Sequence, residues 1–213
     1  MRTGIFGGTF NPFHNGHARQ LEFCRSNGAD LIFCAMSGDF TQRGEPAVLE
    51  KRIRAKHAVQ SGADLVAELP LPYAAAGAKD FAEGGVKLLE KMGCTHICFG
   101  SECGNISLLE KAAELIDSDS FNNSLKLHVK AGKSYPVSAE LAGEEYGGVL
   151  SAPNNILAVE YLRALKSVGS AMRPITLTRN TDYCSESLDS KACVASASAI
   201  RKNLKNEALS EFV

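Results

Sequence analysis

Two histidines three residues apart, His14 and His17, are the side chains of this sequence best placed for chemistry. In a helix this spacing puts both rings on the same face of one turn. An apolar pair and two glycines precede them, and Asn11-Pro12 predicts a turn just before the helix. The first turn of a helix has backbone N–H groups without intrahelical partners and the positive end of the helix dipole. We therefore expect a phosphate to bind there.

This segment resembles the His-x-Gly-His signature of a nucleotidyltransferase superfamily, present here as His14-Asn15-Gly16-His17. The resemblance implies that the histidines and the helix N-terminus hold the phosphates of ATP. Attack on the α-phosphorus builds negative charge on the non-bridging oxygens and on departing pyrophosphate, and fixed donors stabilise that charge. We predict that His14 and His17 act as electrostatic stabilisers, not as nucleophiles. The less favoured alternative is a histidine pair that only caps the helix.

A second motif lies near the other end of the sequence. Residues 196–201 resemble the second superfamily signature, a Ser-x-x-x-Arg-like run that opens a helix. We predict that Ser198 is the N-cap of this helix or a phosphate donor, and that Arg201 reaches the β- or γ-phosphate. Serines before a helix are usually only caps, so this motif gains its weight from the first one.

Alternating strands and helices must position these residues. Apolar runs predict strands ending at Phe6 and spanning residues 31–36, 64–68, 95–99 and 174–178. Helix-periodic segments follow them, at residues 14–26, 48–60, 78–92, 108–116, 153–167 and from 198 onward, while residues 120–148 are less regular. This order predicts an α/β fold, a Rossmann-like doubly wound parallel sheet of the nucleotidyltransferase type.

In such sheets ligands bind beyond the carboxyl ends of the strands. Polar or glycine-rich residues follow each predicted strand directly. Besides the glycine-histidine segment, these are Ser37-Gly38-Asp39-Phe40, Leu69-Pro70, Gly100-Ser101-Glu102 and Arg179-Asn180. Five strand exits are therefore expected to meet at one site.

Four further segments narrow the family. They are the polar loop 36–47 with its Gln42-Arg43-Gly44-Glu45-Pro46 core, the run 68–73, the run 99–102 and the run 154–157. Together with the histidine segment they resemble the tRNA(Met) cytidine acetate ligase family, and the resemblance extends from Gly4 to about Arg201. That family activates acetate with ATP to acetyl-adenylate, releasing pyrophosphate, and acetylates the wobble cytidine of elongator tRNA(Met). The resemblance also implies that the family's C-terminal RNA-binding region is absent here.

The resemblance implies a set of nucleotide contacts as well as the catalytic residues His14, His17, Ser198 and Arg201. The expected ATP-binding residues are Gly7, Gly8, Thr9, Phe10, Asn11, Pro12, Phe13, His14, Asn15, Gly16, His17, Gly100, either or both of Asn154 and Asn155, and Arg179. A glycine at a strand exit lets a base or ribose approach the backbone, an asparagine can contact an adenine edge or a hydroxyl, and arginine pairs with phosphate. Magnesium is expected with ATP, although no ligand cluster points to it.

Two other functions stay open. The form Gly7-Gly8-Thr9-Phe10 resembles nicotinate-mononucleotide and phosphopantetheine adenylyltransferases, in which the acceptor is a small phosphorylated molecule. A nucleotide-binding module that has lost turnover is the non-enzyme alternative. Labelled pyrophosphate exchange with each acceptor in turn would discriminate among them.

Composition limits the partners. The length of 213 residues suits one catalytic domain over residues 1–213. The formal net charge of -1 gives no basic surplus for binding nucleic acid. Any RNA contact is expected to be local or outside this chain. The sequence starts without a long apolar run, and its seven cysteines, an odd number, favour reduced thiols. We expect a cytoplasmic protein with no membrane partner, while the oligomeric state stays undetermined.

Other polar clusters have plainer interpretations. Cys94, His96 and Cys98 alternate along a strand, but their spacing matches no zinc pattern, so no metal site is predicted. A basic helix flank, Lys51, Arg52, Arg54 and Lys56, is expected to be a solvated face rather than an RNA track. Arg43 and Glu45 are equally well explained by solvation and by contact with nucleotide or RNA, and Glu68 is expected to be structural.

Overall fold

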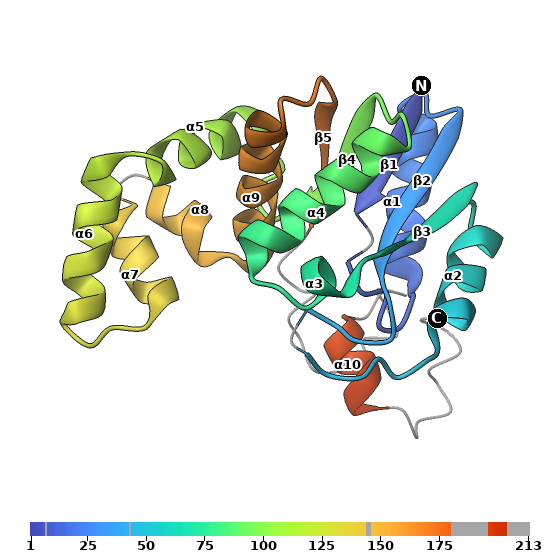
Figure 1. Ribbon diagram of the computed structural model, residues 1–213, viewed down its shortest axis with the longest axis horizontal. Coiled ribbons are helices and arrows are strands. Elements are labelled where there is room, and N and C mark those ends of the chain that lie inside the picture. The colour runs from blue at the N-terminus through green and yellow to red at the C-terminus, as the bar shows by residue number, and fades with distance from the viewer. Residues whose placement is uncertain (7, 43, 144–145, 180–195, 204–213) are drawn as a thin grey trace.

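The computed structural model describes residues 1–6, 8–42, 44–143, 146–179 and 196–203. Its centre is an all-parallel five-stranded sheet with the strand order β3-β2-β1-β4-β5 (Figure 1). The strands are β1 (Arg2–Phe6), β2 (Leu31–Ser37), β3 (Leu65–Leu69), β4 (His96–Ser101) and β5 (Arg173–Thr178). The chain therefore winds outward from β1 to one edge, returns, and continues to the other edge. The predicted doubly wound α/β fold is confirmed.

Helices cover both faces of the sheet (Figure 1). The helices that the structure describes are α1 (Asn15–Ser26), α2 (Lys51–Gln60), α3 (Leu71–Ala74), α4 (Ala78–Lys91), α5 (Ile106–Ile116), α6 (Asp119–Lys130), α7 (Tyr135–Ala142), α8 (Gly147–Ser151), α9 (Pro153–Val168) and α10 (Ala197–Lys202). One hydrophobic cluster joins α4, α5 and α9 to the sheet, and a second lies under α1 and α2. Because β1 lies between β2 and β4, it is covered on both faces and its last four residues are buried.

The cysteines on and beneath the sheet behave as small apolar residues. Cys24, Cys34 and Cys98 are fully buried free thiols in the cluster under α1. Burial raises the pKa of Cys34 to about 12, so this thiol stays protonated. These cysteines therefore fill core space, as the sequence predicts.

The prediction that residues 120–148 are irregular is wrong. Helices α6, α7 and α8 occupy most of this stretch and lie to one side of the sheet (Figure 1). Ser118 caps α6, with its side chain accepting from the N–H of Phe121, and Phe121 anchors the helix in the core. The turn at Gly132 separates α6 from α7. This break interrupts the helical periodicity, so the sequence alone does not display the two helices.

Several element boundaries also differ from the prediction by one to three residues. Helix α2 starts at Lys51 instead of Val48, because the Asp39 carboxylate accepts from the backbone N–H of Lys51 there. Strand β4 continues to Ser101, so Gly100 lies inside the strand. Among the described residues, no helix is both long and apolar enough to cross a membrane.

Candidate active site

Three of the five predicted strand-exit segments supply residues to two adjoining cavities, and the loop after β2 lines them with Thr41, Gln42 and Glu45 instead of the predicted residues 37–40. We call one the aromatic cavity, about 210 Å³, because Phe6, Phe81, Phe99 and Tyr161 line it. The other, the polar cavity, is about 360 Å³ and is lined by His14, Glu102, Ser198 and Arg201 among others. Both are lined by Thr9, Asn11, His17, Gln42, Asn154 and Arg179, so they meet at these residues. Leu69 and Pro70, from the fifth exit, line neither cavity.

The histidine pair forms the N-terminus of α1. His14 is the N-cap: its Nδ1 accepts from the backbone N–H of Gly16 at 3.1 Å, and Nδ1 of His17 accepts from the N–H of His14 at 3.2 Å. The rings stack with centroids 3.8 Å apart. Because both Nδ1 atoms accept, the proton of each neutral ring lies on Nε2. The two rings therefore cap the helix and also present N–H donors, so capping and ligand binding are compatible.

Both rings are held neutral. Burial, together with the positive charges of Arg179 and Arg201, lowers the pKa of His14 to about 3. Burial lowers the pKa of His17 as well, with contributions from His14 and Arg179. The pair can therefore donate two hydrogen bonds to an anion without itself carrying a positive charge.

The backbone between the glycines and the histidines is fixed from both sides. Phe10 has φ 40°, a left-handed conformation that costs energy in a residue with a Cβ. Arg54 donates to the carbonyl of Thr9 at 2.5 Å, and Arg201 donates to the carbonyl of Asn11 at 2.7 Å. The Asn11 side chain also accepts from the N–H of Val48 at 2.8 Å. These contacts hold the strained residue where its neighbours line both cavities.

The sequence predicts that Arg54 belongs to a solvated basic face, and the structure shows that this prediction is wrong. Its side chain is 0% exposed and donates to the carbonyls of Leu49, Thr9, Ser37 and Gly38 at 2.5–3.3 Å. Burial lowers the pKa of the guanidinium from its usual value. Arg54 thus ties the loops after β1 and β2 together. Helix α2 has no clear apolar stripe, so no helical periodicity in the sequence marks Arg54 as buried.

Helix α10 brings the second motif to the first. The N-cap is Ser196, whose side chain accepts from the N–H of Ala199, and not Ser198 as predicted. Ser198 instead accepts from Arg201 at 3.1 Å, and both line the polar cavity. Ser198 is two residues after this cap, in the first turn of α10, and lines the polar cavity with it.

Asn154 and Asn155 have different environments. Asn154 lines both cavities, and its carbonyl oxygen accepts from Nη1 of Arg179 at 2.8 Å. Asn155 is 2% exposed, and its carbonyl oxygen accepts from the N–H of Cys103. Asn154 is therefore the asparagine that can contact a ligand. Gly100 lines the aromatic cavity, and a Cβ there would lie 2.5 Å from Cδ of Arg179, so this glycine makes room for the arginine.

Not every predicted residue reaches a cavity. Gly8, Thr9, Phe10 and Asn11 line the aromatic cavity, whereas Pro12, Phe13, Asn15 and Gly16 line neither and serve the turn and the helix start. Gly7, Arg43 and Asn180 lie outside the described residues. Sequence reasoning missed the site positions of Gln20 and Tyr161, which no motif marks, and gave Thr41 and Glu102 only as parts of motifs.

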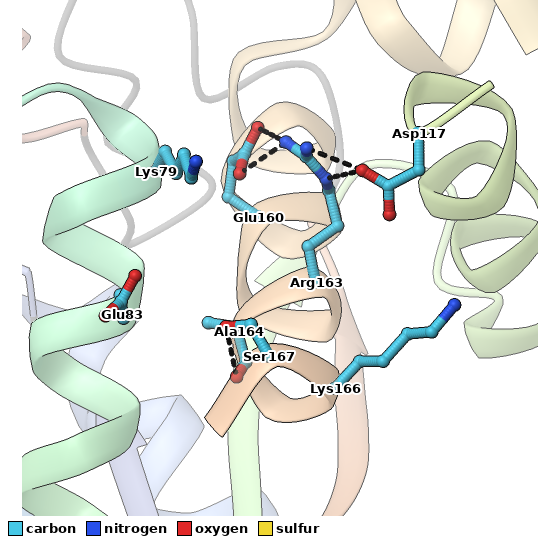
Figure 2. Close-up of a pocket in the computed structure, with 8 residues that line it drawn as sticks. All are labelled: Lys79, Glu83, Asp117, Glu160, Arg163, Ala164, Lys166 and Ser167. Carbon is cyan, nitrogen blue, oxygen red and sulfur yellow. Dashed lines mark hydrogen bonds and ion pairs between the residues drawn. The ribbon is translucent and has the colours of Figure 1, made fainter. Parts of the chain in front are cut away.

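A separate hollow of about 350 Å³ lies between α4 and α9 (Figure 2). Figure 2 shows Arg163 between two acids: it donates to Asp117 at 2.6 and 2.9 Å and to Glu160 at 2.8 and 3.0 Å. Arg163, Asp117 and Glu160 are thus paired with one another in this hollow. Among the described residues, no three His, Cys, Asp or Glu side chains form a metal-binding group.

A family model supplies the comparison that decides the family. The model for the HIGH nucleotidyl transferases matches residues 4–213, nearly the whole chain. The chain belongs to the HIGH nucleotidyltransferase family. The histidine pair at the start of α1 is thus the family signature in its structural setting.

Individual relatives of this nucleotidyltransferase agree on a narrower group. A tRNA(Met) cytidine acetate ligase from Acetivibrio thermocellus is 41% identical over 95% of this chain and 51% of its own length. One from Syntrophotalea carbinolica is 42% identical over 92% of this chain and 49% of its own length. The chain thus spans about half the length of the curated relatives it matches.

Solved structures give the same result. Thermotoga maritima TmcAL bound with alpha-thio ATP superposes with a TM-score of 0.83 at 34% identity, over 99% of this chain and 51% of the other. The apo form of that protein gives 0.86 at 33% identity, over 99% and 52%. The sheet and its flanking helices are therefore shared with these structures.

Proposed function

We propose that this chain binds ATP and uses it to activate acetate, as the catalytic part of a tRNA(Met) cytidine acetate ligase. The observation that carries the proposal is the polar cavity, where two neutral histidine donors face the same space as Arg179 and Arg201. The names of the relatives support acetate and tRNA(Met), and the TmcAL structure with alpha-thio ATP supports the nucleotide.

The polar cavity would hold the triphosphate. We assign the Nε2–H groups of His14 and His17 to the non-bridging oxygens of the α-phosphate, where charge develops in the transition state. Arg201 and Ser198 would hold the β- and γ-phosphates. Arg179 would contact the nucleotide beside Gly100. Magnesium is expected to enter bound to the phosphates.

The proposed reaction has two steps. A carboxylate oxygen of acetate attacks the α-phosphorus, the bond to the bridging oxygen breaks, and pyrophosphate leaves with its electron pair, which gives acetyl-adenylate. The exocyclic amino group of the wobble cytidine then attacks the acetyl carbonyl, loses a proton and releases AMP. The two rings suit the first step, because each Nδ1 lone pair is engaged by a backbone N–H and each Nε2–H can donate to the phosphate oxygens.

The aromatic cavity would take a flat ring. Its rings lie edge to face, with centroids of Phe6 and Phe81 4.6 Å apart and those of Phe6 and Tyr161 5.0 Å apart. Aromatic walls of this kind fit a nucleobase. Because the chain spans about half of its relatives, we propose residues 1–213 as the ATP-binding catalytic part, and contact with elongator tRNA(Met) as a property of the complete ligase.

Pyrophosphate exchange tests the proposal. The chain is incubated with ATP, magnesium and labelled pyrophosphate, and acetate, nicotinate mononucleotide or phosphopantetheine is added in turn. We expect label to enter ATP only when acetate is present, because exchange requires reversible formation of acetyl-adenylate. Exchange that needs a phosphorylated acceptor would instead identify a small-molecule adenylyltransferase. Tight ATP binding without exchange would identify a binding module.

A further inference from the structure

Glu102 stands at the exit of β4 and holds the start of α9. Its Oε1 accepts from the backbone N–H of Asn154 at 3.1 Å and from the side-chain Nδ2 of the same residue at 2.7 Å, while Oε2 accepts from the N–H of Asn155 at 2.8 Å. The N-cap residue of α9, Ala152, has no side chain that could accept these bonds. A carboxylate from another element therefore caps this helix.

The chemistry of the two neighbours fixes the orientation of the Asn154 amide. An ionised carboxylate only accepts hydrogen bonds and a guanidinium only donates them. Nδ2 of Asn154 must therefore face Glu102, and its oxygen must face Arg179, as observed. A neutral amide thus links a negative group to a positive one, and rotating it by half a turn would break both contacts.

The arginine at the far end of this link lies over the nucleotide site. Arg179 lines both cavities, packs across Gly100 and lowers the pKa of His14 through its charge. Glu102 itself lines the polar cavity, yet its two oxygens are engaged by α9 and the Asn154 side chain. Its influence on a bound phosphate would therefore pass through Asn154 and Arg179.

We propose that Glu102 is a positioning residue, which orients the Asn154 amide and thereby places the Arg179 guanidinium for the nucleotide. This rests on the proposed ATP binding. The role goes beyond capping α9, because the Oε1–Nδ2 contact adds nothing to the helix backbone. It predicts that the effects of Glu102 on ATP binding require Asn154, whereas its effects on stability do not.

A double-mutant cycle with Glu102→Gln and Asn154→Ala tests this, with the dissociation constant for ATP measured by calorimetry and the melting temperature measured alongside. Glutamine places an N–H against the donors of α9 and leaves the Asn154 amide without a fixed orientation. We expect each single variant to bind ATP about tenfold more weakly, the size of one charge-assisted hydrogen bond, and the double variant to bind no more weakly than either. Glu102→Gln should lower the melting temperature in both backgrounds.

The matched control is Glu160→Gln, which should leave ATP binding unchanged, because Glu160 lies on α9 and its carboxylate pairs with Arg163 away from both cavities. If the glutamine variant folds poorly, Glu102→Asp, which keeps the charge, takes its place. It should show a smaller loss of ATP affinity with the same dependence on Asn154. Equal losses of affinity in both backgrounds, or a fall in melting temperature alone, would overturn the positioning role. No ATP binding by the wild-type chain would overturn the proposed function as well.

Discussion

Each ring of the histidine pair uses its two nitrogens differently. The Nδ1 atoms complete the first turn of α1, and the Nε2–H groups are left as donors. This division fixes the tautomer through backbone contacts, so a ligand does not have to select it. Electrostatic catalysis depends on donors that are in place before charge develops, and the capping contacts hold these donors in position beforehand.

Replacing His17 should therefore cost more activity than stability. We expect His17→Ala to reduce acetate-dependent pyrophosphate exchange by about a hundredfold or more, because one donor to the developing phosphate charge is lost. His128→Ala, on α6, is the control and should exchange at the wild-type rate. Unchanged exchange in His17→Ala would remove this residue from the proposed mechanism.

Burial of neutral histidines also links stability to pH. The folded pKa of His14 lies near 3, against 6.5 for the ordinary group, so below pH 6.5 the unfolded chain takes up a proton that the folded chain does not. Stability is thus fully present above about pH 6.5 and declines as the pH falls toward 3. At pH 5 the loss from His14 is about 2 kcal/mol.

Urea unfolding at pH 7, 6 and 5 measures this loss. His14→Asn lacks the titrating ring, so its free energy of unfolding should fall less steeply with pH than that of the wild type. Parallel pH profiles for the two proteins would show that His14 is not held neutral in the folded state.

At the scale of elements, the sequence predicts the sheet and its convergence point well, because buried parallel strands are continuous apolar runs. It predicts α6 to α8 poorly, because their short periods are broken by Gly132 and Gly143 and their packing is against one another. It also misplaces Arg54, since a charged residue in a basic helix is usually solvated and only the loops around it create its partners. Distant carbonyl groups leave no local signal.

Arg54 should matter for both stability and activity because it joins two elements. We expect Arg54→Met to lose about 3 kcal/mol of unfolding free energy, since several buried carbonyls are left without donors. Arg54→Lys should lose less, because an ammonium reaches some of these carbonyls. Exchange measured at a temperature where the variants are folded should fall at least tenfold, as the Thr9 segment loosens.

Arg163→Met is the matched control for Arg54→Met. Arg163 is also an arginine, with a side chain that is 24% exposed, and it forms ion pairs with Asp117 and Glu160 in the remote hollow (Figure 2). Its replacement should cost about 1 kcal/mol or less and leave exchange unchanged. Equal losses of exchange in the two variants would mean that Arg54 acts through general stability alone.

At the scale of the whole molecule, the site is closed by the two ends of the described chain. Arg201 of α10 donates to the carbonyl of Asn11, 190 residues earlier. The cavities lie where β1 and β4, adjacent strands at the centre of the sheet, leave the sheet in the same direction. The motif pair that resembles a superfamily signature is thus a single structure formed from separate parts of the chain.

A variant lacking residues 196–213 should keep the fold of the sheet and lose the activity of the site. We expect its circular dichroism to retain the helix and strand signals, because α10 is a short helix outside the sheet, while pyrophosphate exchange falls at least a hundredfold with the loss of Ser198 and Arg201. Arg201→Met, in the full chain, should show a smaller loss. Near wild-type exchange by the truncated chain would contradict a role for α10 in holding phosphate.

Because Arg201 contacts Asn11, which is far earlier in the chain, the order of synthesis also sets the order in which the site is assembled. The ribosome releases the histidine segment first, and β2 can pair with β1 soon afterwards, but β4 and then α10 emerge much later. Until then the nascent chain exposes its signature helix without the walls that would enclose a nucleotide. Under the proposed function, nucleotide capture would therefore wait until translation has passed α10, and an unfinished chain would not sequester ATP.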